Sequence, residues 1–354
     1  MSRVMVGMSG GVDSSVAALL LHRAGYEVVG ATMKLFESEE VGGSRENLCC
    51  SWEAVERARH VCEVIGIRHY VLNVTEAFGR DVIEHFVAEY RRGRTPNPCL
   101  RCNEIIKWGE MLRRARGLEC EHIATGHYAR VDGDEGRWRL RRGADRGKDQ
   151  SYALYMLSQE ELAHTLLPLG DLQKSEVREL AAEAGLASAQ TRESQDICFV
   201  PQGDYRVLFG EEAMRPGLIV SRAGEALGRH RGLPAYTVGQ RKGLGIAAGE
   251  PLYVLGKDTA SNTLIVGTRA EAVRRTLLVE AMNWIGIAPP EPGAILEAGV
   301  EVRYRARPVR GTVTILEEKT AKVELGPTEQ IAAPGQGAVF YRGDEVLGGG
   351  VICE

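Results

Sequence analysis

The chain has 354 residues, 44% of them hydrophobic, and a formal net charge of −4, values typical of a soluble globular protein of about two to three domains. It contains no apolar run of about 18 residues, so we expect no transmembrane helix, and its first residues lack the layout of a signal peptide. Eight cysteines without a secretion signal indicate cytoplasmic thiols, metal ligands or catalytic groups.

The first twenty residues read as a strand (Arg3–Val6), a glycine-rich turn (Gly7–Ser15) and a buried helix (Val16–Leu21). This layout directs backbone N–H groups and a helix N-terminus towards a phosphate, and Gly10 and Gly11 let the backbone approach it closely. No lysine follows the glycines as in a Walker A loop, and no G-x-G-x-x-G is present. A carboxylate beside phosphates needs a counter-ion, and for Asp13 we expect a divalent metal. The simpler alternative is a capped strand-to-helix turn.

Strands and helices alternate through roughly the first 200 residues. We expect strands at 27–35, 69–74 and 122–125 and helices at 52–65, 78–90, 105–116 and 173–185. This alternation predicts a doubly wound parallel α/β sheet, with ligands at the carboxyl ends of its strands.

Five of the eight cysteines fall into three groups. Cys49 and Cys50 are loop thiols without an assigned role. Cys99 and Cys102 form a C-x-x-C after a proline-rich loop, just before the helix expected near residue 104. Three roles remain open for this pair: a zinc half-site, a redox pair, or a thiolate reagent that serves the phosphate site. Cys198, in Ile-Cys-Phe-Val, is typical of a small core residue of a strand.

Two stretches of the chain are locally basic although the total charge is negative. Residues 91–116 carry a local charge of +6 and residues 137–148 one of +5. A polyanion responds to such local charge more than to the total. The alternative is a solvated surface whose arginines are balanced by neighbouring carboxylates.

After Pro201 the pattern changes to short strands separated by glycine and proline. Leu252–Leu255 and Thr263–Val266 predict a hairpin. Five further strands are expected, at 300–304, 311–316, 322–325, 338–341 and 346–352. This all-β pattern is typical of a barrel.

Several strings, in a fixed order, resemble the bacterial tRNA-specific 2-thiouridylase family from end to end. This family lies within the ATP pyrophosphatase (PP-loop) superfamily. Ser9–Ser14 resembles the phosphate loop of that superfamily. The other strings are Asn97–Asn103, Ala124–Tyr128, Lys148–Tyr152, Asp196–Phe199, Thr237–Gly245, Arg303–Arg305 and Pro334–Gln336. The resemblance implies a PP-loop domain (1–200), a central β-rich tRNA-binding domain (201–272) and a C-terminal β-barrel (273–354).

The resemblance also implies an activity: ATP-dependent replacement of the C2 oxygen of the wobble uridine by sulfur in tRNAs for Lys, Glu and Gln. Cys102 matches the family's nucleophile, and Cys198 matches the cysteine that carries the persulfide. Asp13 is placed with them at the catalytic site. The implied ATP-site residues are Gly7, Met8, Ser9, Gly10, Gly11, Val12, Asp13, Ser14, Met33 and Gly126. The implied tRNA contacts are Asn97, Pro98, Cys99, His127, Lys148, Asp149, Gln150, Arg303, Tyr304 and Gln336.

Two chemical routes follow from this resemblance. In the first, ATP with Mg²⁺ adenylates the uridine oxygen, and a persulfide on Cys198 supplies sulfur, leaving a Cys102–Cys198 disulfide. In the second, Cys99, Cys102 and Cys198 hold a [4Fe–4S] cluster; some family members carry Asp at the position of Cys99. We favour the persulfide. The expected partners are the tRNA anticodon arm and a sulfur-donor protein, either a cysteine desulfurase or a sulfur-relay protein, with no membrane; we expect a monomer.

Two other functions compete. Another PP-loop enzyme, an ATP-dependent ligase, would need no paired cysteines. A tRNA-binding module with a decayed ATP site is disfavoured by the intact loop with Asp13 and Ser14.

Overall fold

The computed structural model describes residues 2–36, 52–133, 136–190, 197–200 and 204–353. The chain divides into two compact units. Unit 1 comprises residues 1–82, 99–203 and 344–346, and unit 2 comprises residues 83–98, 204–343 and 347–354. Cys49 and Cys50 lie outside the described residues. Within the described ranges, no helix has the length and apolar character needed to cross a membrane.

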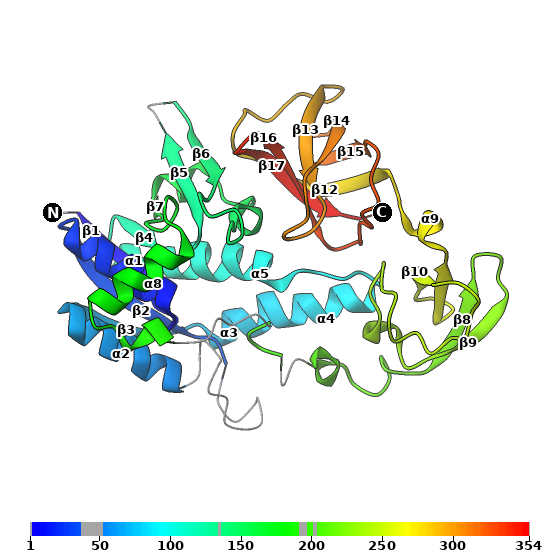
Figure 1. The fold of residues 1–354 in the computed structure, drawn as a ribbon, viewed down its shortest axis with the longest axis horizontal. Coiled ribbons are helices and arrows are strands. Elements are labelled where there is room, and N and C mark those ends of the chain that lie inside the picture. Colours follow the sequence, from blue (N-terminus) through cyan, green and yellow to red (C-terminus); the bar gives the residue numbers. More distant parts are fainter. Residues whose placement is uncertain (1, 37–51, 134–135, 191–196, 201–203, 354) are drawn as a thin grey trace. The chain divides into compact units, whose positions relative to one another are not determined.

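Unit 1 is built on a five-stranded parallel sheet, as the alternation of elements predicts. Its strands run in the order β3 (Arg68–Asn73), β2 (Glu27–Lys34), β1 (Arg3–Gly7), β4 (His122–Ala124) and β7 (Thr165–Leu166) (Figure 1). Every pairing is parallel, with Val4 beside both Val28 and His122. The doubly wound sheet is therefore confirmed.

Helices cover both faces of this sheet. Val4 and Val6 of β1 join a core with α1 (Val12–Arg23), α2 (Trp52–Ile65) and α8 (Lys174–Glu183). Side chains alternate along a strand, so Gly7, an odd-numbered position, faces the other way, and there it lies beside Met111. Trp108 lies on the same helical segment as Met111, and its indole N–H donates to the Thr165 hydroxyl at 2.7 Å.

The helices around the proline-rich loop differ from the prediction. The expected helix at 78–90 is a continuous run of α3 (Thr75–Phe78), η1 (Gly79–Ile83) and α4 (Glu84–Arg91). The helix expected from residue 105 begins at Pro98, as α5 (Pro98–Arg101), η2 (Cys102–Met111) and α6 (Leu112–Gly117). Proline suits a first helical turn because its missing N–H has no helical partner there. The C-x-x-C therefore lies within the helix.

Four further elements of unit 1 follow β4 along the chain. β5 (Ala129–Gly133) and β6 (Trp138–Arg142) form an antiparallel hairpin that the sequence pattern did not predict. η3 (Ser151–Leu154) and α7 (Gln159–Ala163) follow it. A capping box of Ser158 and Glu161 begins α7.

The central part of unit 2 is a four-stranded sheet in the order β10 (Tyr253–Asp258), β11 (Thr263–Gly267), β8 (Gly217–Ser221) and β9 (Ala226–His230). The β10–β11 pair is the hairpin that the sequence predicts. Ile219, Val254 and Leu264 are fully buried and form its core. Between β9 and β10 stands a short turn, η7 (Leu233–Ala235).

The C-terminal part of unit 2 is a closed six-stranded barrel. Its strands are β12 (Thr276–Trp284), β13 (Ile295–Glu301), β14 (Val309–Glu317), β15 (Thr320–Leu325), β16 (Gly337–Arg342) and β17 (Glu345–Ile352). The pairing of β12 with β17 closes the barrel. Val300, Val313 and Phe340 are fully buried inside it. The barrel is confirmed, although β12 was not predicted.

Helix α4 belongs to unit 2 through its aromatic side chains. The Tyr90 ring lies 5.1 Å from that of Tyr205 and 5.5 Å from that of Phe209, and Phe86 lies 6.2 Å from Tyr205. The ammonium of Lys257, on β10, stands 5.1 Å from the centroid of the Tyr90 ring. This cluster buries an apolar surface that the sequence pattern assigned to the N-terminal sheet.

Candidate active site

The glycine-rich loop leaves β1 at Gly7 and enters α1 at Val12. Gly10 has a φ of +72°, and a Cβ there would lie 2.6 Å from the Ala54 carbonyl oxygen, so the turn requires glycine. The Ser9 N–H donates to the Ser14 hydroxyl at 3.1 Å, and that hydroxyl donates to the Gly11 carbonyl at 3.0 Å. Gly11 caps α1 without a side-chain bond, so the first amides of the helix can serve an anion.

Asp13 has its counter-ion within the chain. The Lys174 ammonium donates to both carboxylate oxygens, at 2.6 and 2.8 Å, and the Tyr128 hydroxyl donates to Oδ1 at 2.6 Å. The Lys174 side chain is only 11% exposed, whereas that of Asp13 is 33% exposed. A lysine cation at the start of α8 therefore stands beside the phosphate loop, and the expected divalent metal stays a prediction.

Residues 126–128, which follow β4, lie against this loop. A Cβ on Gly126 would lie 2.7 Å from the Asp13 carbonyl carbon, so the two backbones touch. The Tyr128 N–H donates to the Gln150 side chain at 3.0 Å, and the Gln150 N–H donates to the Tyr128 carbonyl at 2.8 Å. Gln150, an expected tRNA contact, is therefore tied to the loop through Tyr128.

The same framework reaches the C-x-x-C helix. Buried Asn103, next to Cys102, donates to the Ala153 carbonyl at 2.7 Å, three residues beyond Gln150. Asp149 accepts from the Arg142 guanidinium at 2.8 Å and from the Gly143 N–H at 3.0 Å, and its side chain is 7% exposed. Asp149 thus braces this segment rather than presenting a free carboxylate. The phosphate loop, Ala124–Tyr128, Lys148–Tyr152 and the C-x-x-C helix form one hydrogen-bonded assembly.

The three expected functional cysteines are all at least partly accessible. Cys99 is exposed, and Cys102 and Cys198 are partly exposed. Cys198 lies in a turn closed by the Val200 N–H on the Ile197 carbonyl, which corrects the strand-core interpretation. Phe199 anchors that turn against Phe78, with ring centroids 5.6 Å apart.

These cysteines do not fit an iron–sulfur cluster as they are arranged. Within the described residues, which include all three thiols, no three His, Cys, Asp or Glu side chains are grouped so that they could hold a metal ion. By contrast Cys62 is buried, which raises the pKa of its thiol to about 12 and suits a core residue.

His127 lies in the interior of unit 1, 8% exposed. Its Nδ1 lies 2.7 Å from the Thr125 hydroxyl and its Nε2 3.4 Å from the Lys107 ammonium. Burial, and to a lesser degree Lys107, lowers the pKa of His127 well below its usual value, so the ring is neutral at physiological pH. The expected contact of His127 with tRNA stays a prediction.

The remaining expected residues are spread over both units. Met33, near the carboxyl end of β2, and Lys148 are partly exposed, as is Asn97, while Pro98 is buried. In unit 2 the Gln336 amide donates to the Thr95 carbonyl at 2.6 Å, and the Thr95 N–H donates to the Pro334 carbonyl at 2.7 Å. The barrel therefore holds the segment before Asn97.

A second group of expected tRNA residues lies between β13 and β14. Arg303 and Arg305 are exposed and Tyr304 is partly exposed. The Arg305 guanidinium lies 5.2 Å from the centroid of the Tyr304 ring. This arrangement presents cationic groups and an aromatic ring at one turn of the barrel.

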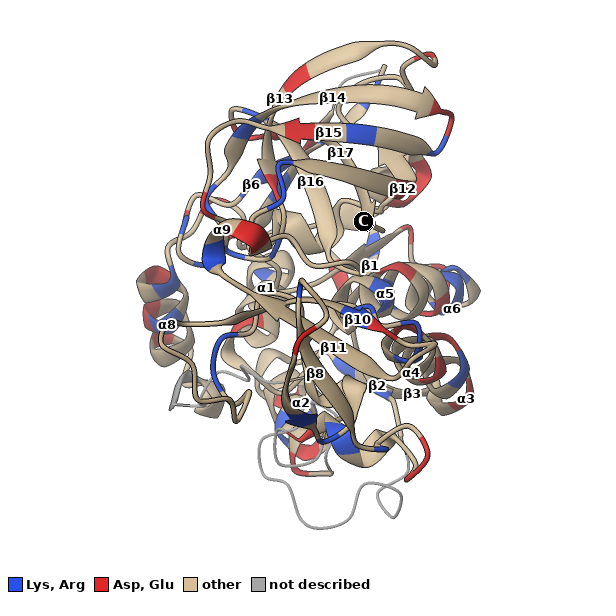
Figure 2. Cartoon of the chain, turned by 90° about the vertical axis from the view of Figure 1, so that its right-hand side faces the viewer, with Lys and Arg blue, Asp and Glu red and all other residues tan. Residues whose placement is uncertain are grey.

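Most arginines of the two basic stretches are paired with carboxylates. In the first stretch Glu89 binds Arg92, and Glu110 binds Arg113. In the second, Asp149 binds Arg142 and Asp344 binds Arg146. Figure 2 shows the same mixing of charges along α8. The balanced-surface alternative therefore describes these stretches better than a continuous cationic patch.

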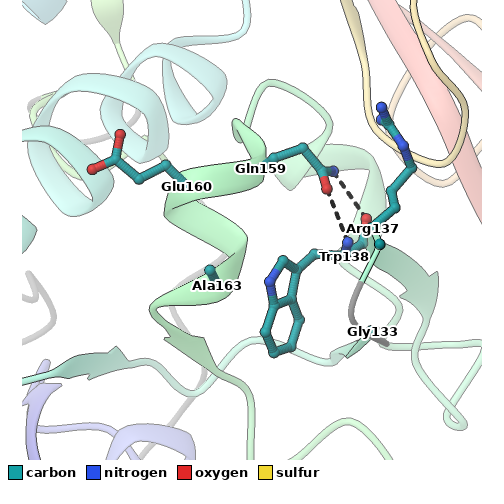
Figure 3. A pocket seen from close by; sticks show the side chains of 7 residues that line it. Gly133, Arg137, Trp138, Gln159, Glu160 and Ala163 are labelled. Atoms are coloured by element: carbon teal, nitrogen blue, oxygen red, sulfur yellow. Dashed lines mark hydrogen bonds between the residues drawn. The ribbon is translucent and has the colours of Figure 1, made fainter.

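A hollow of about 660 Å³ lies beside the β5–β6 hairpin (Figure 3). The Gln159 side chain crosses it, accepting from the Trp138 N–H and donating to the Trp138 carbonyl, both at 2.9 Å. Its lining includes none of the expected site residues.

Two residues at the phosphate loop escaped the sequence interpretation. Lys174 falls within the helix expected at 173–185, and Tyr128 is the last residue of the string Ala124–Tyr128. The capping box of Gln173 and Glu176 marks where α8 begins, but no local signal places Lys174 against Asp13, 161 positions away.

Comparisons with known proteins agree with this architecture. Residues 2–202 match the family model "tRNA methyl transferase HUP domain", residues 208–268 "tRNA methyl transferase PRC-barrel domain", and residues 274–352 "Aminomethyltransferase beta-barrel domain". The chain is 50% identical to a tRNA-specific 2-thiouridylase of Chloroflexus aurantiacus over 100% of this chain and 99% of the relative. It is 49% identical to that of Moorella thermoacetica (98% of each chain) and 43% identical to that of Clostridium perfringens (99% and 98%). The chain belongs to the tRNA-specific 2-thiouridylase family.

Proposed function

We propose that this enzyme replaces the C2 oxygen of the wobble uridine of tRNA by sulfur, using ATP and a cysteine persulfide. The observation that carries the proposal is the single framework in which Tyr128 binds Asp13 of the phosphate loop and Gln150, while Asn103 fixes the C-x-x-C helix to the same segment. A phosphate site and an accessible thiol on one rigid framework suit activation by ATP followed by sulfur transfer.

The first step makes the uridine oxygen a leaving group. The oxygen at C2 attacks the α-phosphorus of ATP, the N3 proton is lost, and pyrophosphate leaves. We expect the amides of Gly10–Asp13 and the Lys174 ammonium to stabilise the charge on pyrophosphate. Asp13 orients Lys174, and Mg²⁺ that enters with ATP would add charge neutralisation on the phosphates.

The second step delivers sulfur. The terminal sulfur of a persulfide on Cys198 bonds to C2, and AMP leaves with the oxygen. The Cys102 thiolate then attacks the Cys198 sulfur, which frees 2-thiouridine and leaves a Cys102–Cys198 disulfide. Alternatively, Cys102 first releases sulfide from the persulfide, with the same disulfide as product. A dithiol reductant restores both thiols.

The partners follow from this chemistry. A sulfur-donor protein, a cysteine desulfurase or a relay protein, must load Cys198. The substrate is the anticodon arm of tRNAs for Lys, Glu and Gln, whose uridine must unstack to reach the thiol. We place the reaction in the cytoplasm, where thiols stay reduced, and propose a monomeric enzyme.

The test is 2-thiouridine formation on unmodified tRNA with ATP, Mg²⁺, a cysteine desulfurase and a reductant. We expect Cys102→Ser and Cys198→Ser each to lose at least about 10³-fold in activity, because each removes a covalent participant. Cys353→Ser is the matched control, since that partly exposed thiol is not among the expected site residues and donates to the Leu278 carbonyl at 3.2 Å.

Cys99→Ser separates the two routes. Under the persulfide route it retains activity within about threefold, because Cys99 takes no part in bond making. Loss of activity in Cys99→Ser, together with three to four irons per chain after anaerobic purification (about the content of a [4Fe–4S] cluster), would instead establish the cluster route.

A further inference from the structure

The loop from Thr237 to Pro251, between η7 and β10 of unit 2, carries a string of the resemblance to which no role is assigned. Its glutamine closes the turn from inside. The Thr237 N–H donates to the Gln240 side-chain oxygen at 3.0 Å, and the Gln240 side-chain nitrogen donates to the Lys242 carbonyl at 2.9 Å. The Gly239 N–H donates to the Val254 carbonyl at 2.8 Å, and the Val254 N–H donates to the Gln240 carbonyl at 3.0 Å. The loop is therefore a built element joined to β10.

The tip of this loop is turned outwards by its glycines and held by one leucine. Gly239, Gly243 and Gly245 have φ values of +87°, +79° and +70°. Leu244, between the last two, is buried in the core of the central sheet. Because the anchor points inwards, Arg241 and Lys242 on the preceding positions are left exposed. Gly243 and Gly245 have no side chains, so the backbone of the tip is uncovered at these two positions.

The charges at this tip differ from those of the basic stretches. Neither Arg241 nor Lys242 forms an ion pair with any residue that the structure describes. Ile246 lies 3.8 Å from the position of a Cβ on Gly228, which places β9 and its exposed Arg229 next to the loop. A shallow hollow of about 390 Å³ adjoins the tip, lined by Arg241, Gly243, Gly245 and the exposed carboxylate of Glu250. The cations therefore face solvent beside a concave surface.

We propose that the tip Arg241–Gly245 is a phosphate-binding site for the RNA backbone of the tRNA substrate, with Arg241 and Lys242 as its charged contacts. The chemistry is that of a phosphodiester: two adjacent cations, uncovered backbone and no aromatic ring or buried polar group that would read a base. This proposal rests on the proposed function, because it takes tRNA as the ligand. The site sets affinity and orientation, and it takes no part in the sulfur chemistry.

The experiment measures the dissociation constant of unmodified tRNA against KCl concentration for the full-length enzyme. The double variant Arg241→Gln/Lys242→Gln loses two charges, and we expect the slope of log K against log [KCl] to fall by about 1–2 and the affinity at 0.1 M salt by about tenfold. The matched control, Arg269→Gln/Lys319→Gln, removes two other exposed charges from unit 2 and should leave the slope unchanged.

Two further readouts keep the outcome decisive. The single-turnover rate of the double variant at saturating tRNA should stay at the wild-type value. The single variant Arg241→Lys, which keeps both charges, should have the wild-type salt slope. A slope in the double variant equal to that of wild type, with an unchanged melting temperature, would overturn the proposal. Failure of the proposed function looks different: the wild-type enzyme itself would form no 2-thiouridine, whatever its loop.

Discussion

At the scale of single residues, the pair of Lys174 and Asp13 is the least expected feature of the phosphate loop. Lys174→Met leaves a carboxylate beside the phosphates without its cation. We expect kcat/KM for ATP to fall by about 100-fold, measured as pyrophosphate release, because a positive charge is lost where negative charge develops. Unfolding should become easier by only about 1–2 kcal/mol, since the Asp13 carboxylate is one-third exposed.

A double-mutant cycle checks that interpretation. Asp13→Asn/Lys174→Met removes both charges and should recover most of the lost stability but none of the lost activity. Lys174→Arg should keep part of the activity because it retains the charge. If Lys174→Met released pyrophosphate at the wild-type rate, the lysine would be structural only.

His127 gives a pH prediction. Its pKa is lowered by burial, so below about pH 6.5 the unfolded chain binds a proton that the folded chain does not. The free energy of unfolding is therefore unaffected by His127 above about pH 6.5, and it decreases as the pH falls below that value. The loss is about 1.4 kcal/mol for each unit by which the pKa is lowered.

Urea unfolding at several pH values measures this effect. His127→Gln cannot take up the proton, so its free energy of unfolding should change less between pH 6.5 and 5 than that of wild type. Equal slopes for the two proteins would show that another group causes the acid sensitivity.

At the scale of elements, the contact between the barrel and the segment before Asn97 is the most testable. Gly335 has a φ of +92°, and a Cβ there would lie 2.9 Å from the Thr95 backbone. Gly335→Ala should therefore cost about 2–4 kcal/mol, from left-handed strain plus the clash. Hydrogen exchange at the Thr95 amide, which is bonded to Pro334, should speed up.

Gly343→Ala is the matched control. Gly343 has a φ of +60° but nothing lies within 4 Å of its would-be Cβ, so it carries the strain of about 1 kcal/mol without the clash. Exchange at Thr95 should remain as in wild type. Equal effects of the two substitutions would mean that the contact with Thr95 contributes nothing.

How far the sequence predicted these elements depended on the range of the interactions. The strand, turn and helix around Gly10, the β10–β11 hairpin and the barrel follow from local patterns and were predicted. The helix begins at Pro98, earlier than predicted, because proline fits a first helical turn as well as a loop. Cys198 was misplaced because its apolar neighbours, including Phe199, bury themselves from a turn as well as from a strand. The pairing of Glu110 with Arg113 was within reach of the sequence, at a spacing of three.

At the scale of the whole molecule, unit 2 takes residues 83–98 from the middle of the N-terminal half and joins them to residues 204–343. The family models divide the chain differently, with one match spanning 2–202. The boundaries at 200 and 272 stay a prediction for the sequence segments; among the packed units, the second includes α4 from within the first segment.

The aromatic cluster on α4 has a consequence for how the chain is made. Tyr90 leaves the ribosome long before Tyr205 and Phe209, which cover it in the finished protein. At about 5–20 residues per second, the delay is on the order of ten seconds. During that time the parallel sheet of unit 1 is still incomplete too, because β7 and α8 have yet to emerge. A nascent chain halted near residue 200 would thus expose the aromatic face of α4, with Phe86 and Tyr90, the kind of surface to which chaperones bind.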